Sequence, residues 1–168
     1  TLRNGVRVHL AHRDAVPVVN VAMQFDAGYA ADAGGKLGLS GFTLDMMDEG
    51  AGNLDALEIA ARAEELGAEV ATSSSLDVSS VSLSALKTNL RESLELWSTV
   101  IREPRFEEAE LERLRDQVVA NIAQEKSRPR SIGLRLLPPA MYGDGHAYGI
   151  PLTGSGTEAA VAAIDRDD

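Results

Sequence analysis

The 168-residue sequence contains no cysteine and few aromatic residues. Without cysteine the chain can form neither a disulfide nor a thiolate zinc site, and it has no cysteine nucleophile. Aromatic residues make up only 4% of the chain, with a single tryptophan at Trp97. Because 44% of the residues are hydrophobic, a core is still expected, built mainly from Leu, Val, Ile, Ala and Met.

Clustered positive charge is also lacking, and the formal net charge is −10. Lys and Arg are interspersed with Asp and Glu, as in residues 110–116. Nucleic-acid binding needs grouped cations opposite the phosphates. The charge pattern therefore argues against a nucleic-acid partner and against an anionic membrane surface.

Apolar stretches long enough to span a membrane are missing as well. No secretory signal is visible at Thr1, where the sequence begins without Met. We therefore expect a processed chain or a piece of a longer one.

Alternation of apolar and polar side chains predicts four strands, at residues 5–11, 18–25, 68–74 and 76–85. The links within the first pair and within the second pair are short, so each pair is expected to be antiparallel. The alternation slips by one position between Val78 and Val81. This slip predicts a bulge near Ser79 and Ser80.

Apolar residues at spacings of three and four predict helices between and after the strands. The predicted helices cover residues 37–48, a segment after Asn53, residues 86–101, 107–127 and 131–142, and a short segment from Thr157. Asn53 and Thr157 are expected N-caps, whereas Gly67 and Pro104 are expected stops. Pro138 and Pro139 are expected to interrupt their helix, and residues 143–156 to form an irregular loop.

This order of elements predicts an α+β fold, with an antiparallel sheet and helices packed on one of its faces. No repeat and no long linker divides the sequence, so residues 1–168 are expected to form a single domain. The sequence stops after Ile164 without a closing strand, which indicates a domain that is incomplete at its C-terminal end.

The histidines do not form a recognisable metal motif. His9 and His12 lie on or just after the first predicted strand, where their spacing directs them to opposite faces. His146 lies in the glycine-rich loop. A zinc site normally takes three protein ligands with suitable spacing, so we interpret the histidines as exposed or locally hydrogen-bonded.

Other polar clusters also favour structural roles. The segment Gly154-Ser155-Gly156-Thr157 precedes a helix, but the Lys and the buried strand of a phosphate loop are absent, so capping is favoured. Asp45, Asp48 and Glu49 lack EF-hand spacing and are interpreted as a solvated helix end. The serines of the last two predicted strands have no evident histidine partner.

Residues 38–50, Gly-Leu-Ser-Gly-Phe-Thr-Leu-Asp-Met-Met-Asp-Glu-Gly, resemble the active-site helix of the pitrilysin/insulinase-type zinc peptidases. Active members carry Gly-Leu-Ala, then His-x-x-Glu-His, then a Met and a Gly-Thr-like turn. The order and spacing of further segments also resemble the family, at residues 2–8, 16–19, 28–32, 66–68, 110–113 and 142–149.

The resemblance places Gly41 at the first zinc histidine, Leu44 at the general-base Glu and Asp45 at the second histidine. Asn121 is placed at the third ligand, a Glu in active members, with Glu125 as the alternative. Active members use the two imidazoles to hold zinc and the Glu to activate its bound water. The resemblance therefore implies that this chain has no catalytic residue and binds no zinc or other cofactor.

Members of this family pair homologous halves into a clamshell around an unfolded peptide, and one half often lacks zinc. The resemblance implies an inactive domain that pairs with an active, zinc-bearing half and helps to enclose peptide substrate for proteolysis. A structural assembly subunit, similar to the core subunits of the respiratory bc complex, is the alternative, and an unrelated binding module is a third. Since bacterial members are often exported, the bacterial periplasm or envelope is expected rather than the cytoplasm.

Overall fold

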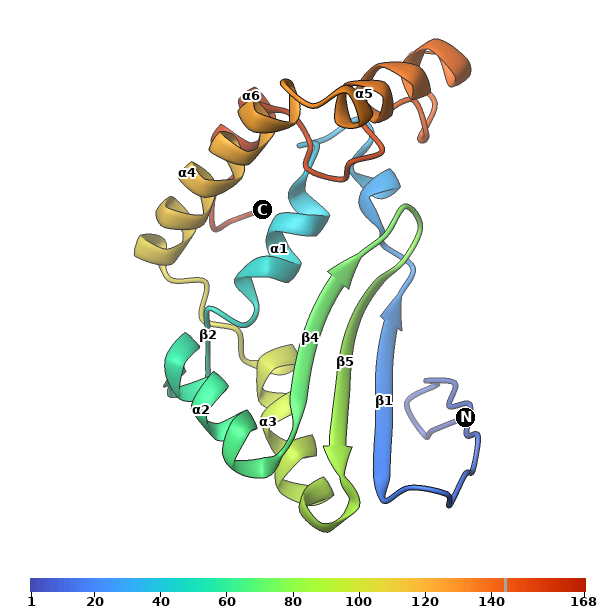
Figure 1. Ribbon diagram of the computed structural model, residues 1–168, viewed down its shortest axis with the longest axis vertical. Helices are drawn as coiled ribbons and strands as arrows, with labels where there is room; N and C mark the ends of the chain where they lie inside the picture. Colours follow the sequence, from blue (N-terminus) through green and yellow to red (C-terminus); the bar gives the residue numbers. More distant parts are fainter. Residues whose placement is uncertain (144) are drawn as a thin grey trace.

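The computed structural model describes residues 1–143 and 145–168, which form an α+β fold (Figure 1). The main sheet is antiparallel in the order β1-β5-β4, with β1 at Val18–Phe25, β4 at Glu69–Ser74 and β5 at Ser79–Leu86. Two short strands, β2 (Gly50–Ala51) and β3 (Leu54–Asp55), pair separately. The helices are α1 (Leu39–Met46), α2 (Ala56–Leu66), α3 (Leu90–Arg102), α4 (Glu108–Glu125), α5 (Pro129–Tyr142) and α6 (Glu158–Ala162), with short 3-10 turns at Tyr29–Asp32 (η1) and Lys87–Asn89 (η2).

In the residues that the structure describes, helices cover one face of the main sheet and leave the other uncovered. In β5, Val81 and Leu83 are buried beneath α3, while Ser82 and Ser84 alternate with them and lie on the uncovered face. Helix α1 contacts the outer strand β4 from the helical side of the molecule (Figure 1). The predicted fold class is therefore confirmed.

The prediction of a strand at residues 5–11 is wrong. Residues 1–17 form an exposed irregular segment in which Leu2 donates its N–H to the carbonyl of Val6 and Gly5 donates to Leu2. The apolar alternation is present, but Leu10 is 89% exposed and residues 5–11 do not pair with β1. Alternation describes the two faces of a strand, and it does not by itself bring the segment onto the edge of β1 that has no strand partner in the described residues.

The predicted bulge near Ser79 and Ser80 is also absent. The β4–β5 register runs without interruption from Ser74 opposite Ser79 to Glu69 opposite Ser84. The apparent slip arises because Val78 belongs to the hairpin turn, so the strand begins later than the predicted residue 76. Ser79 lies on the buried face of β5, where its hydroxyl donates to the carbonyl of Ala27 at 2.7 Å.

Two helix boundaries differ from the prediction. Asp55, not Asn53, caps α2, and it forms a capping box in which Asp55 and Glu58 bond each other's backbone N–H groups at 2.8 and 3.0 Å. Helix α3 begins at Leu90 rather than at residue 86 because the turn η2 precedes it. Thr157 caps α6 as predicted, with Ala160 donating to its hydroxyl at 3.2 Å.

Helix α5 continues through Pro138 and Pro139, which were expected to interrupt it. Proline has no N–H to donate to the carbonyl four residues earlier. The carbonyl of Leu134, which Pro138 leaves without its helical donor, accepts instead from the N–H of Leu152 at 2.9 Å. A donor from the following loop thus repairs the hydrogen-bond ladder.

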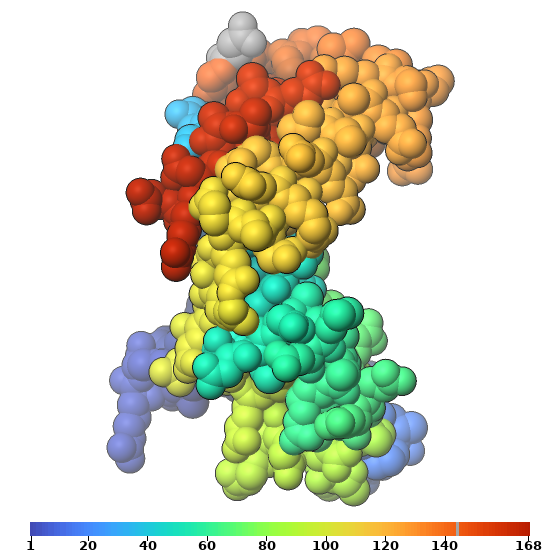
Figure 2. All heavy atoms as spheres, turned by 90° about the vertical axis from the view of Figure 1, so that its left-hand side faces the viewer, coloured from blue at the N-terminus to red at the C-terminus, as the bar shows by residue number. Residues whose placement is uncertain are grey.

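Two apolar cores lie on opposite sides of α1. The sheet core joins Leu44 and Met47 to residues of β5, α2 and α3, including Val81. The helix core joins Phe42 and Met46 to α4, α6 and Ile164. Figure 2 shows the two parts as an upper body of α4–α6 and a lower body that contains α2 and α3. Helix α1 therefore connects both cores.

The start of α1 is fixed by the buried carboxylate of Asp32. It accepts from the N–H of Gly38 at 3.0 Å, from the N–H of Ser40 at 3.2 Å and from the Ser40 hydroxyl at 2.5 Å. These bonds satisfy donors at the helix N-terminus that have no partner within the helix. Gly38 has φ 101°, a left-handed conformation that favours glycine.

Replacing Asp32 with Ala should lower the free energy of unfolding by about 2 kcal/mol, because it leaves buried N–H donors unpaired. Urea denaturation followed by circular dichroism measures this change. The matched control is Asp26→Ala, since Asp26 is exposed on the neighbouring loop. Equal stability of the two variants would contradict a capping role for Asp32.

Candidate functional site

The candidate site is the α1 segment that contains Gly41, Leu44 and Asp45. The three side-chain positions have different surroundings, although they lie within little more than one turn of helix. Leu44 is only 7% exposed and packs in the sheet core with Met47 and Val81. Its side chain therefore serves as an apolar contact between α1 and the sheet.

Gly41 is half-buried beside the glycine-rich loop. A Cβ atom at this position would lie 3.6 Å from the carbonyl oxygen of Gly154, which is an ordinary contact. The loop is held against α1 a few residues away, where a Cβ on Gly156 would lie 1.9 Å from the carbonyl oxygen of Leu37. The backbone of the loop thus lies close to Gly41.

Asp45 is exposed, and the carboxylates of Asp48 and Glu49 lie near it at the end of α1. Burial of part of its carboxyl group, followed by the charge of Asp48 and then of Glu49, raises the pKa of Asp45 above its ordinary value of 3.8. The pKa of Asp48 is raised in the same direction, mainly by burial. Glu49 is paired with Arg113 at 2.5 Å. The carboxylate of Asp45 therefore lies beside other negative charges. This differs from a catalytic pair, in which two groups share a hydrogen bond.

Helix α4 provides the two candidates for the third ligand. Asn121 is exposed on this helix, next to the fully buried Ile122. Glu125 instead points into a polar network, where its Oε2 atom accepts from Arg135 at 2.8 Å and from the Ser155 hydroxyl at 2.8 Å. Arg135 is 10% exposed, so the ion pair is largely buried and Glu125 is already engaged.

The three histidines are not brought together. His9 and His12 lie in the exposed N-terminal segment. His146 stacks on Tyr142 with ring centroids 5.1 Å apart, and its Nδ1 atom accepts from the N–H of Tyr148 at 3.0 Å. Within residues 1–143 and 145–168, no group of three or more His, Asp or Glu side chains is placed to hold a metal ion.

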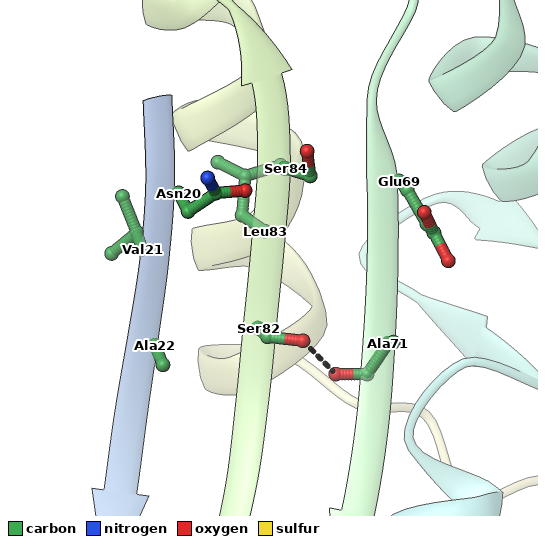
Figure 3. Close-up of a pocket in the computed structure, with 8 residues that line it drawn as sticks. All are labelled: Asn20, Val21, Ala22, Glu69, Ala71, Ser82, Leu83 and Ser84. Carbon is green, nitrogen blue, oxygen red and sulfur yellow. Dashed lines mark hydrogen bonds between the residues drawn. The ribbon is translucent and has the colours of Figure 1, made fainter. Parts of the chain in front are cut away.

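The uncovered face of the sheet contains a shallow hollow of about 280 Å³ (Figure 3). Short side chains line it, among them Asn20, Ala22, Ser82 and Ser84, with Glu69 at one side. The Ser82 hydroxyl donates to the carbonyl of Ala71 at 3.2 Å, which links β5 to β4. The sequence prediction did not identify this surface, because it depends on which strands become neighbours.

A family model described as insulinase, peptidase family M16, matches residues 7–155. The chain belongs to this family. Among curated proteins, the uncharacterized zinc protease YmxG of Bacillus subtilis is 26% identical over 167 residues, which are 99% of this chain and 40% of YmxG. The M16 chain therefore spans about two fifths of that relative's length.

Solved structures show the same fold. A peptidase M16 inactive domain from Pseudomonas fluorescens is 25% identical with a TM-score of 0.86, over 92% of this chain and 37% of that one. A protease from Helicobacter pylori gives a TM-score of 0.80 at 19% identity, over 90% of this chain and 36% of that one. The family resemblance inferred from residues 38–50 is thus confirmed.

The residues present do not fit the zinc ion that active members of the family hold. Gly41 offers no donor atom, Leu44 is an apolar core residue, and Glu125 is bonded to Arg135 and Ser155. Zinc in proteins is bound by nitrogen, sulfur and carboxylate oxygen donors, normally three or four together. Asp45 alone does not supply this set.

Introducing a carboxylate at Leu44 should destabilise the fold. Leu44→Glu should lower the free energy of unfolding by about 3 kcal/mol or more, because it removes an apolar contact and places a charge in the sheet core. Leu57→Glu is the control, since Leu57 is 81% exposed on α2. Denaturant titration compares the two, and similar stability would contradict the packing role of Leu44.

Replacing Asp45 with Asn should raise stability at neutral pH. Since the pKa of Asp45 is raised in the folded chain, its charged form opposes folding above that raised pKa. This destabilisation of the folded chain becomes smaller as the pH falls through the raised pKa toward the ordinary value of 3.8, because Asp45 is then protonated. We expect Asp45→Asn to gain less than about 1 kcal/mol at pH 7, because the side chain is exposed, and nothing at acidic pH. A gain that grows on acidification, measured by thermal unfolding, would contradict this assignment.

Proposed function

We propose that this chain is a non-catalytic M16 domain that pairs with an active homologous half and helps to enclose peptide substrate. The observation that carries the proposal is the burial of Leu44 in the sheet core, at the position that the family resemblance gives to the general-base Glu. A leucine there can neither accept a proton from water nor orient it. Catalysis must then come from zinc and a general base in the partner.

The flanking positions support the same proposal. Gly41 and Asp45 together provide one carboxylate where active members provide two imidazoles, and Glu125 is held by Arg135. The resemblance to a Pseudomonas fluorescens protein described as an M16 inactive domain also agrees with it. Under this proposal the role of α1 is to connect the two cores.

Peptide enclosure is supported by the outer edge of the sheet. Strand β4 lies at one end of the order β1-β5-β4 in the described residues, so one of its edges has no strand partner. An extended peptide can add to such an edge through backbone hydrogen bonds. The uncovered face beside it is lined by short side chains that leave room for a chain to pass.

A peptidase assay with zinc tests the proposal. The purified chain alone should not cleave a set of quenched fluorogenic peptides. Mixed with an M16 homologue that carries His-x-x-Glu-His, from the same organism, it should form a complex in which cleavage exceeds that of the homologue alone. Replacing the motif Glu of the partner should abolish cleavage, whereas Asp45→Ala in this chain should leave it unchanged.

Two outcomes would contradict the proposal. The first is cleavage by the chain alone that is lost in Asp45→Ala, which would make this chain catalytic. The second is a complex with the homologue that cleaves no better than the homologue alone, which would favour a structural assembly role. Size-exclusion chromatography with light scattering distinguishes the second outcome from a failure to associate.

A further inference from the structure

Three ring side chains form a cluster at the end of α5. The ring of His146 stacks on that of Tyr142, with the centroids 5.1 Å apart and the planes at 19°. Tyr148 meets both rings edge-on, with its centroid 5.8 Å from that of Tyr142 and 5.5 Å from that of His146. Only 4% of the chain is aromatic, yet this cluster contains two of its three tyrosines.

His146 also holds the backbone of the loop. Its Nδ1 atom accepts from the N–H of Tyr148 at 3.0 Å, and its backbone carbonyl accepts from the N–H of Gly149 at 2.8 Å. The turn is tight, since a Cβ atom on Gly149 would lie 2.3 Å from the carbonyl oxygen of Gly143. The bond to Nδ1 requires that this nitrogen carry no proton, because an imidazole nitrogen accepts a hydrogen bond only in that form.

Tyr148 connects this turn to the hairpin between β4 and β5. Its hydroxyl donates to Oδ1 of Asp77 at 2.8 Å, across 71 residues of sequence. This hydrogen bond, followed by the charge of Asp77, raises the pKa of Tyr148 above its ordinary value of 10.0, so the phenol remains a donor at neutral and acidic pH. The backbone of Tyr148 is thus bonded to His146 while its side chain is bonded to the hairpin.

The hairpin itself is held against the start of η1. Tyr29 donates its N–H to the carbonyl of Ser75 at 3.0 Å, and Ala30 donates to that of Leu76 at 2.8 Å. A Cβ atom on Gly28 would lie 2.4 Å from the carbonyl oxygen of Ser75, so the two backbones are in close contact. A change in the turn is therefore expected to move the ring cluster rather than the hairpin.

Protonation of the imidazole changes which of its contacts are favourable. Histidine is the side chain that ordinarily changes charge between about pH 5 and 8. Once Nδ1 carries a proton it is a donor that faces the N–H of Tyr148, so their hydrogen bond is lost. The stack on Tyr142 is retained, because an aromatic face attracts a cation. A protonated His146 therefore keeps Tyr142 and releases the backbone of Tyr148.

The charged and titratable groups around the cluster do not replace the lost acceptor. The carboxylate of Asp77 attracts an imidazolium, but it bonds the hydroxyl of Tyr148 and not its N–H. Tyr29 on η1 stays neutral, because burial and then the charge of Asp77 raise its pKa above 10.0. Asp144, two residues before His146 in the sequence, lies outside the described residues, and its charge is tested separately below.

We propose that Tyr142, His146, Tyr148 and Asp77 form a pH-sensitive latch. It joins the end of α5 to the β4–β5 hairpin when His146 is neutral and opens when His146 is protonated. In the open state the N–H of Tyr148 bonds to water, and its hydroxyl leaves Asp77 because the turn that positions it is lost. The latch requires neither a partner nor any residue of α1, so it does not depend on the function proposed above.

An NMR titration of the ¹⁵N-labelled chain between about pH 5 and 8 tests the latch. The amide proton of Tyr148 should shift upfield on acidification, with the same midpoint as the imidazole of His146. The amide of Val78 in the hairpin should follow that midpoint too. Tyr148→Phe, which removes the bond to Asp77 and keeps the N–H, should abolish the response of Val78 alone.

The remaining variants assign the response to one side chain. His146→Gln should abolish the responses of both amides, whereas His12→Gln in the exposed N-terminal segment is the matched control and should leave them unchanged. Asp144→Asn should also leave both responses in place. Circular dichroism at each pH verifies that every variant is folded.

Three results would overturn the latch. The first is an amide of Tyr148 that does not follow the titration of His146. The second is a response of Val78 that persists in Tyr148→Phe, since the hairpin would then sense pH without the bond to Asp77. The third is loss of both responses in Asp144→Asn while His146 still titrates, which would assign them to Asp144.

Discussion

The burial of α1 on two sides is the constraint on which the rest of the structure depends. Leu44 and Met47 attach this helix to the sheet core, and Phe42 and Met46 attach it to the helix core. Asp32 fixes where the helix begins, and the glycine-rich loop closes over it through the contact of Gly156 with Leu37. Under the proposed function, Leu44 has replaced the general-base Glu of active relatives and contributes packing instead.

This exchange has a physical logic. A general-base carboxylate must be reached by water, whereas a leucine at the same position stabilises the domain by leaving water. Under the proposed function the base and both imidazoles are absent, so a free carboxylate on α4 would have no metal to bind. Glu125 instead forms a largely buried ion pair with Arg135, which fixes the orientation of α5. Under this proposal, the absence of metal donors and the stability of the domain are therefore consistent with each other.

Much of the fold could be predicted from the sequence, and the failures have identifiable causes. The strand Val18–Phe25 was predicted at its observed bounds because its alternation is regular and its pairing edge exists. Residues 5–11 alternate equally well but do not pair, although β1 has one edge without a strand partner in the described residues. Pro138 did not break α5 because Leu152, distant in sequence, supplies the missing donor. For the candidate site, the resemblance of residues 38–50 directed attention to Gly41, Leu44 and Asp45. The burial of Leu44 and the hydrogen bonds of Glu125 depend on contacts between distant elements, which sequence spacing does not encode.

The most direct test of the account is the zinc content of the purified chain. The chain is incubated with excess zinc, passed through a desalting column and measured by inductively coupled plasma mass spectrometry. The account predicts far less than one zinc ion per chain, with the same value for Asp45→Ala and Glu125→Gln. One zinc ion per chain, retained at micromolar affinity or better and lost in either variant, would contradict it.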